Sequence, residues 1–211
     1  MTNILYLASG SRSRKRLLQE SGIPFAIIDQ TADEHSIDRS LPFDELLIKI
    51  ALLKMEHAVL PKKMNAEEIF VLTADTMGYV TNGAIHGKPK DYEDAVKKIR
   101  NLSGKPTTTK TAFCLEKKIW QNNNWQTETQ HTEIVSATYL FNVKDELIDT
   151  YIKHSFALQA SGAISIESYG EQFLAWVHGS YSTILGLPMF EVRNALEKMN
   201  FFKSYSTIPL T

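Results

Sequence analysis

The sequence predicts an α/β fold in which a mixed β-sheet is flanked by helices, within a single domain over residues 1–211. Short apolar runs typical of buried strands alternate along the chain with segments whose apolar residues recur every three or four positions. The chain has 211 residues, 43% of them hydrophobic, which is enough for a sizeable core. No internal repeat, low-complexity block or long linker divides it.

The first elements form a strand, loop and helix unit. Residues 3–7 are a short apolar strand, and the small polar run 8–11 leads into a basic helix that ends at Gly22. Residues 25–29 predict a second strand. The unit therefore resembles those that bind ligands in the loop between strand and helix.

A polar loop and a long helix come next. The loop covers residues 30–40 and contains Asp33 and Glu34. Pro42 suits the first turn of the following helix. The apolar residues of that helix recur with helical spacing at Phe43, Leu46, Ile50 and Leu53.

The central strand is the most apolar segment of the chain. Residues 69–74 predict a buried strand that delivers Asp75 at its carboxyl end. The pair Asn82-Gly83 predicts a hairpin turn between strands 77–81 and 84–86. Gly87-Lys88-Pro89 then ends the second of these strands.

The rest of the chain alternates in the same way. Asp91 is placed to cap a helix that stops at Gly104. Further expected elements are strands 107–116 and 132–143 joined by a loop near 122–124, a helix over 144–153, a loop or strand over 160–170, a strand over 172–177, and a last helix beginning at Pro188.

Composition excludes several classes of function. The chain has 23 Lys plus Arg against 24 Asp plus Glu, so it lacks the positive field that binds nucleic acid polymers. The single cysteine, Cys114, excludes an intrachain disulfide and paired-cysteine metal sites. No histidine pair has the spacing of a metal motif.

Targeting signals are also missing from the sequence. The apolar run at residues 4–8 precedes the basic cluster at 12–16, the reverse of the order in a secretory signal. Apolar stretches fall far short of the roughly 20 residues that span a bilayer. We therefore expect a cytoplasmic protein with no membrane partner.

Three features point to a polar site at the rim of the sheet: the loop and basic helix start at 8–16, the pair Asp33-Glu34, and Asp75. A loop of small residues that opens a helix presents backbone N–H groups to an anion, and Arg12, Arg14 and Arg16 can neutralise phosphate. The loop is not a P-loop, because GxxxxGK[ST] is absent.

Each of these features also has a purely structural explanation. Ser9 or Ser11 can cap the helix, and the arginines can form a solvated face. Lys54 can extend its ammonium group to solvent. A buried Asp75, in contrast, needs a partner or a metal.

The combined order of eight segments resembles the Maf family, the septum-formation-inhibitor-like nucleoside triphosphate pyrophosphatases. The matching segments are LASGSRSRKRLLQESGIPF (7–25), ADE (32–34), IALLK (50–54), TADTMG (73–78), IHGKP (85–89), LSGKPTTTKTAF (102–113), ASGAISIESYG (160–170) and GSYSTILGLP (179–188). The resemblance implies an elongated mixed sheet, two lobes with a central cleft, similarity to inosine triphosphate pyrophosphatases, and a possible homodimer.

Residue by residue, the resemblance implies a site for a nucleoside triphosphate. It gives a substrate-binding role to Ser9, Ser11 and Arg14, and catalytic roles to Asp75, Lys54 and Lys88. Glu34 and Asp75 would hold a divalent metal, Mg²⁺ in the first place and Mn²⁺ as the alternative. Hydrolysis between the α and β phosphates would then release pyrophosphate, with Asp75 activating water directly or through the metal.

Two residues give conflicting indications of the base. Thr76 matches the subgroup that prefers dTTP and UTP, whereas Glu167 matches the subgroup that acts on 7-methyl-GTP. An ionised glutamate only accepts hydrogen bonds, so it favours bases with N–H donors. Two other functions stay open: a nucleotide-binding regulator of cell division with weak or no catalysis, and an interaction scaffold whose polar residues would be scattered over the surface.

Overall fold

A computed structural model describes residues 3–62, 67–80 and 85–205. It confirms the α/β class. The chain divides into two compact units, which we describe separately. Unit 1 comprises Met1–Asp75, Ala112–Ile134 and Gly186–Thr211, and unit 2 comprises Thr76–Thr111 and Val135–Leu185. The predicted turn at Asn82-Gly83 lies outside the described residues.

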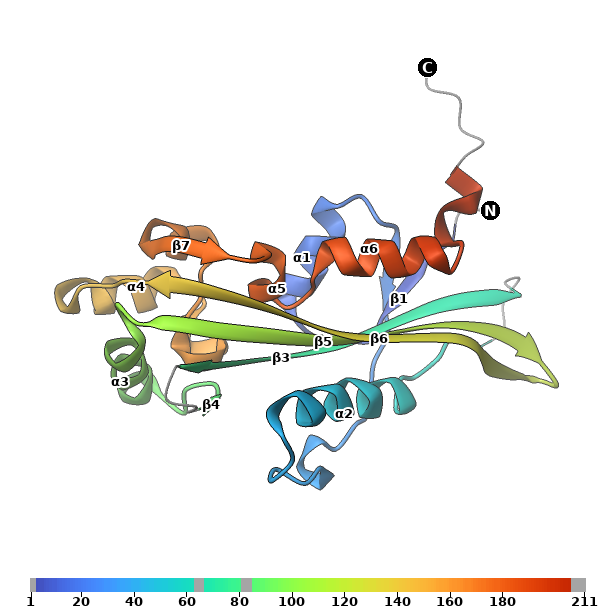
Figure 1. Cartoon of the computed structure of the whole chain (residues 1–211), viewed down its shortest axis with the longest axis horizontal. Helices are drawn as coiled ribbons and strands as arrows, with labels where there is room; N and C mark the ends of the chain where they lie inside the picture. Colours follow the sequence, from blue (N-terminus) through green and yellow to red (C-terminus); the bar gives the residue numbers. More distant parts are fainter. Residues whose placement is uncertain (1–2, 63–66, 81–84, 206–211) are drawn as a thin grey trace, which may run out of the picture. The chain divides into compact units, whose positions relative to one another are not determined.

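The strands form a mixed sheet, as predicted (Figure 1). They are β1 (Leu5–Leu7), β2 (Phe25–Ile27), β3 (Glu68–Val80), β4 (Ile85–His86), β5 (Pro106–Gln121), β6 (Asn124–Phe141) and β7 (Leu174–His178). Their order is β2-β1-β3-β5-β6-β7, with β4 beside β3. β1 is parallel to β2 and β3, whereas β4 is antiparallel to β3 and β7 to β6.

The predicted helices are present in the predicted order, and α5 is an additional helix that was not predicted. The α-helices are α1 (Arg12–Glu20), α2 (Phe43–Glu56), α3 (Tyr92–Leu102), α4 (Ile148–His154), α5 (Tyr181–Leu185) and α6 (Met189–Lys198). Short 3-10 helices are η1 (Glu34–Ser36), η2 (Asp145–Leu147), η3 (Ala157–Gln159), η4 (Ser161–Ala163), η5 (Ser168–Phe173) and η6 (Phe201–Tyr205). Each helix in the described part of the chain is too short or too polar to cross a bilayer.

Unit 1 has a hydrophobic layer on each face of its strands. Phe70 and Leu72 of β3 pack with β1 and with α1 and α6, whereas the alternate residues Ile69 and Val71 pack with Met55 of α2. Figure 1 shows α1 and α6 on one side of these strands and α2 on the other. Because both faces are covered, the strand is apolar at successive positions, as in a buried parallel sheet.

The core of unit 2 gathers around Tyr151 of α4, which is fully buried. Its ring packs against Phe141 of β6 and Phe173 of η5. Its hydroxyl accepts a hydrogen bond from the backbone N–H of Ser165 at 2.6 Å. α4 thereby fixes the segment that leads to Glu167.

Local sequence signals for helix ends are confirmed. The side chains of Ser11 and Asp91 accept hydrogen bonds from the backbone N–H groups of Arg14 and Asp94, so both residues are N-caps. Gly22 and Gly104 follow helices with φ of +68° and +72°. Pro42 and Pro188, expected in the first turns of their helices, instead occupy the preceding cap positions.

The prediction that a strand ends at Asp75 is wrong, because β3 continues from Glu68 to Val80. Thr73 and Asp75 are polar residues within the strand. The hydroxyl of Thr73 donates to the carbonyl of Ala51 at 2.8 Å, and Asp75 bonds Lys54, so α2 satisfies both side chains. The polar residues that follow the apolar run therefore mark the point where β3 side chains hydrogen-bond to α2, and the strand does not end there.

Strands β5 and β6 are longer than the predicted ranges 107–116 and 132–143. Their additional residues pair across the strands: Lys117 contacts Glu128 at 2.8 Å, and the rings of Trp120 and Trp125 meet edge to face at 5.1 Å. Asn122 and Asn123 connect the strands with positive φ values of 52° and 60°, as in a two-residue hairpin turn.

Two further boundaries differ from expectation. The predicted helix 144–153 begins as 3-10 helix η2 before α4. Residues 161–163 and 168–173 form η4 and η5, so β7 begins at Leu174 and not at residue 172.

Candidate active site

The loop after β1 holds Arg14 in a fixed position in unit 1. The guanidinium Nη1 donates to Ser9 Oγ at 3.0 Å, and Nε donates to the carbonyl oxygen of Gly186 at 2.9 Å. Arg14 is buried, with 8% of its surface exposed. Burial lowers the pKa of Arg14 from its usual 12.5, and the charges of Asp75 and Glu34 act in the opposite direction. The guanidinium therefore lies in the electrostatic field of both carboxylates.

Lys54 joins these two carboxylates directly. Its Nζ is 2.6 Å from Asp75 Oδ1 and 3.0 Å from Glu34 Oε1. The side chains of Lys54 and Asp75 are 10% and 12% exposed, whereas that of Glu34 is 38% exposed. The buried pair thus opens toward solvent on the side of Glu34. The structural alternative, in which Lys54 extends to solvent, is wrong.

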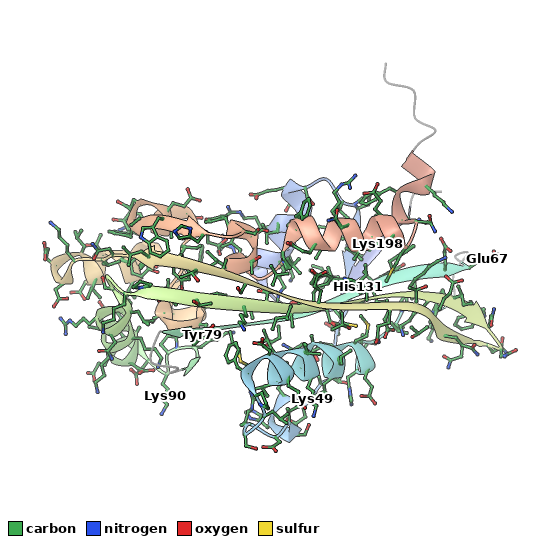
Figure 2. All side chains as sticks on the ribbon, viewed as in Figure 1. Lys49, Glu67, Tyr79, Lys90, His131 and Lys198 are labelled. Carbon is green, nitrogen blue, oxygen red and sulfur yellow. The ribbon has the colours of Figure 1, made fainter. Side chains whose placement is uncertain are left out.

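The helical pattern of α2 explains why Lys54 points inward. Ile50 and Ala51 are fully buried and precede Lys54 by four and three residues, so they share its face of the helix. Lys49 lies on the side of α2 that faces away from the strands, where it pairs with Glu45 at 2.9 Å (Figure 2). The two lysines of one helix therefore have different roles.

The unit 1 cluster, defined as Ser9, Arg14, Glu34, Lys54 and Asp75, brings together residues from four segments of the chain. Its two cations and two carboxylates have a formal charge of zero. Ser11, predicted beside it, is the N-cap of α1 and accepts from the backbone N–H of Arg14 at 3.4 Å. Because the cluster is bonded internally and mostly buried, its residues are not scattered as in an interaction scaffold.

Three predicted site residues belong to unit 2. Thr76 is half-buried, and its Oγ1 lies 2.9 Å from Thr111 Oγ1. Glu167 is buried, with 7% of its surface exposed, and precedes η5. Lys88 follows β4 and is exposed. Unit 2 thus provides one exposed cation, one half-buried hydroxyl-bearing side chain and one buried acidic side chain.

Two residues that contact predicted site residues were not predicted from the sequence. Gly186, whose carbonyl holds Arg14, has a φ of +108°, a conformation that favours glycine. Thr111 is fully buried beside Thr76. Both lie in segments that carried the family resemblance, but only the structure reveals their partners.

The carboxylates of the unit 1 cluster are candidate metal ligands. Each contacts Lys54 through one of its two oxygens, and the other oxygen could serve as a metal ligand. Within residues 3–62, 67–80 and 85–205 there is no group of three or more His, Cys, Asp or Glu side chains placed to hold a metal. Mg²⁺ suits such a site, because it commonly uses one or two carboxylates and takes its other ligands from water and phosphate.

Comparisons with known proteins agree on the family. The family model described as Maf-like protein matches residues 4–199. A protein of Bdellovibrio bacteriovorus named dTTP/UTP pyrophosphatase is 32% identical over 94% of this chain and 100% of its own length. Proteins with the same name from Geotalea uraniireducens and Ruminiclostridium cellulolyticum are also 32% identical, over 94% and 95% of this chain and 95% and 97% of their own lengths.

Proposed function

The chain belongs to the Maf-like protein family, and from this premise we propose that it is a nucleoside triphosphate pyrophosphatase that acts on dTTP or UTP. The reaction adds water to the α-phosphorus, breaks its bond to the bridging oxygen, and yields a nucleoside monophosphate and pyrophosphate. The names of the relatives support this substrate class. We place the reaction in the cytoplasm, where such nucleotides are present.

The observation that carries the proposal is the unit 1 cluster. Lys54 fixes Asp75 at 2.6 Å, and Ser9 and Gly186 fix the guanidinium of Arg14. Positioned cations and a positioned carboxylate are what hydrolysis of a phosphoanhydride needs, because catalysis depends on orienting water and stabilising charge on phosphate. A binding protein has less need for a buried carboxylate held in this way.

Asp75 is our candidate for the group that takes a proton from water. The other groups have complementary roles: Arg14 and Lys88 bind phosphate oxygens, and Lys54 orients Asp75 and adds positive charge. Ser9 holds Arg14 and can donate its hydroxyl to phosphate. Ser11 keeps the start of α1 formed, so that its N–H groups face an anion.

The electrostatic balance supports a requirement for a divalent cation. The cluster is neutral overall, whereas a nucleoside triphosphate has about four negative charges. Glu34 and Asp75 would hold Mg²⁺, or Mn²⁺ in its place, through the carboxylate oxygens that do not contact Lys54. When bound, the ion supplies positive charge to the phosphates and lowers the pKa of coordinated water.

Base recognition is assigned to unit 2. Thr76 supports dTTP and UTP, in line with the names of the relatives, and Glu167 supports a second candidate, 7-methyl-GTP. Glu167 is buried, and an ionised carboxylate only accepts hydrogen bonds, so it would favour a base with N–H donors over one without them.

The decisive experiment measures pyrophosphate release with Mg²⁺ from dTTP, UTP, CTP, 7-methyl-GTP and inosine triphosphate. We expect turnover of dTTP and UTP, and a loss of at least about 100-fold in Asp75→Asn, which keeps the shape but removes the charge. Asp145→Asn, at an exposed side chain of unit 2, is the matched control. Full turnover by folded Asp75→Asn would refute the role of Asp75.

Two other outcomes would redirect the proposal. Preference for 7-methyl-GTP would make Glu167 the better guide to the base. Binding of nucleotides without any pyrophosphate release would favour a regulator of cell division. The same protein preparation tests the homodimer that the family resemblance implies, by its mass in light scattering.

A further inference from the structure

Three threonines of unit 2 are linked in a row. Thr76 Oγ1 lies 2.9 Å from Thr111 Oγ1, and Thr111 Oγ1 lies 2.8 Å from the backbone carbonyl oxygen of Thr183. Thr111 and Thr183 are fully buried, whereas Thr76 is only half-buried. Of the three side chains, that of Thr76 is therefore the one that a ligand can reach.

The chemistry of the groups fixes the direction of both hydrogen bonds. A carbonyl oxygen can only accept, so Thr111 must donate its single hydroxyl hydrogen to Thr183. Thr111 then has no hydrogen left for Thr76, and Thr76 must be the donor of that pair. Toward any further partner, the hydroxyl oxygen of Thr76 can only accept.

The Thr183 end of this row lies in a helix that is itself bonded to another segment of unit 2. The Thr183 carbonyl belongs to α5, and the hydroxyl of Tyr181 on the same helix donates to the carbonyl of Ile166 at 3.2 Å. Ile166 is buried and directly precedes Glu167. α5 thus connects the row of threonines to the segment of the other candidate base contact.

We propose that Thr111 is a positioning residue for base selection: it fixes Thr76 as a hydrogen-bond acceptor, so that the protein selects pyrimidines with an imide N3–H. The inference rests on the proposed function, because Thr76 is there the contact to the base. Uracil and thymine carry a hydrogen at N3, and cytosine of nearly the same shape carries a lone pair. If Thr76 can only accept, it forms a hydrogen bond with the N3–H of uracil or thymine and is repelled by the N3 lone pair of cytosine.

The test compares kcat/KM for UTP with kcat/KM for CTP. Thr111→Val replaces the hydroxyl by a methyl group and frees Thr76 to donate. We expect the UTP-to-CTP ratio to fall about five- to tenfold, the effect of one hydrogen bond. Thr111→Ser keeps the hydroxyl and should retain the ratio. Thr109→Val, a buried threonine on the same face of β5 that bonds Tyr139, is the matched control and should also retain it.

A double-variant cycle shows whether Thr111 acts through Thr76. In a Thr76→Val background, Thr111→Val should leave the ratio unchanged, because no hydroxyl remains to be oriented. If Thr111→Val does not fold, Thr111→Ala removes the same hydroxyl with less bulk.

Several results would overturn the inference. They are an unchanged ratio in Thr111→Val, an equal fall in the Thr76→Val background, and a wild-type preference for CTP. Absence of pyrophosphate release from every nucleotide by the wild-type protein is a different result, since it removes the proposed function itself and the role of Thr111 with it.

Discussion

Lys54 has a structural role in addition to the catalytic role that we propose for it. Its ammonium group is the shared partner of Asp75 and Glu34, and its side chain is 10% exposed. Breaking a buried ion pair on one side leaves an uncompensated charge, which costs more than the pair contributes. The site and the stability of unit 1 are therefore linked at this residue.

We expect Lys54→Met to lower pyrophosphatase activity by at least about 100-fold and the free energy of unfolding by roughly 2–4 kcal/mol. Urea denaturation and pyrophosphate release measure the two effects. Lys49→Met, on the exposed face of the same helix, should change stability by less than about 0.5 kcal/mol. Equal effects of the two substitutions would show that Lys54 has no special role.

Glu116 is a buried carboxylate outside the candidate site. It accepts hydrogen bonds from Thr127 at 2.9 Å and Gln130 at 2.6 Å, and it pairs with Lys118. Burial raises its pKa, but the bonds from Lys118, Gln130 and Thr127 outweigh burial and hold the pKa below the usual 4.5. The ionised form is thus favoured by folding.

The lowered pKa has a consequence for stability. A carboxylate with a depressed folded pKa stabilises the protein above its unfolded pKa, and this contribution disappears as pH falls through the folded pKa. We expect Glu116→Gln to be roughly 1–3 kcal/mol less stable than the wild type at pH 7, with the difference shrinking as pH falls below about 4.5. Urea denaturation at pH 7, 5, 4 and 3 measures it. A difference independent of pH would contradict this assignment.

At the scale of elements, the segment 161–170 depends on a close backbone approach. A Cβ added to Gly170 would lie 1.8 Å from the carbonyl oxygen of Ser165. Ser165 cannot shift easily, because its N–H is bonded to the buried hydroxyl of Tyr151. The glycine therefore allows η5 to pack against the backbone of Ser165, two residues before Glu167.

We expect Gly170→Ala to destabilise the protein by about 3 kcal/mol or more, because the added methyl group forces a backbone shift. Thermal unfolding followed by circular dichroism measures the effect. Gly87→Ala is the matched control in the same unit, since a Cβ there has no neighbour within 4 Å. If both variants lowered the melting temperature equally, the close approach of Gly170 to Ser165 would not be the cause of the destabilisation.

Some features of these elements could be predicted from the sequence and others could not. The caps at Ser11 and Asp91 were predictable, because each bond joins residues three positions apart. The continuation of β3 through Asp75 was not, since its polar residues are satisfied by α2, more than 20 residues earlier in the chain. Local pattern contains no information about such a partner.

The residues of the candidate site could also be predicted from the sequence, whereas their contacts could not. The family resemblance supplied Arg14, Glu34, Lys54 and Asp75 as residues, but not their contacts. The hydrogen bond between Arg14 and Gly186 joins residues 172 positions apart, and the one between Thr76 and Thr111 joins residues 35 positions apart. These separations exceed any period of a helix or strand, so only the folded chain reveals them.

At the scale of the whole molecule, the chain passes between its two units four times. Three of these passages occur within strands: in β3 after Asp75, in β5 after Thr111, and in β6 after Ile134. Neither unit is formed from one continuous segment. Unfolding of one unit would therefore break the strands that also supply residues to the other.

We expect the two units to unfold in a single cooperative transition. Trp120 and Trp125 lie in unit 1 and Trp176 lies in unit 2, where it is partly exposed. In Trp176→Phe, tryptophan fluorescence reports on unit 1 whereas far-ultraviolet circular dichroism reports on both units. Urea midpoints from the two signals should coincide, because coincident probes are the mark of two-state unfolding. Separate midpoints would mean that the units unfold as independent domains in spite of the strands that they share.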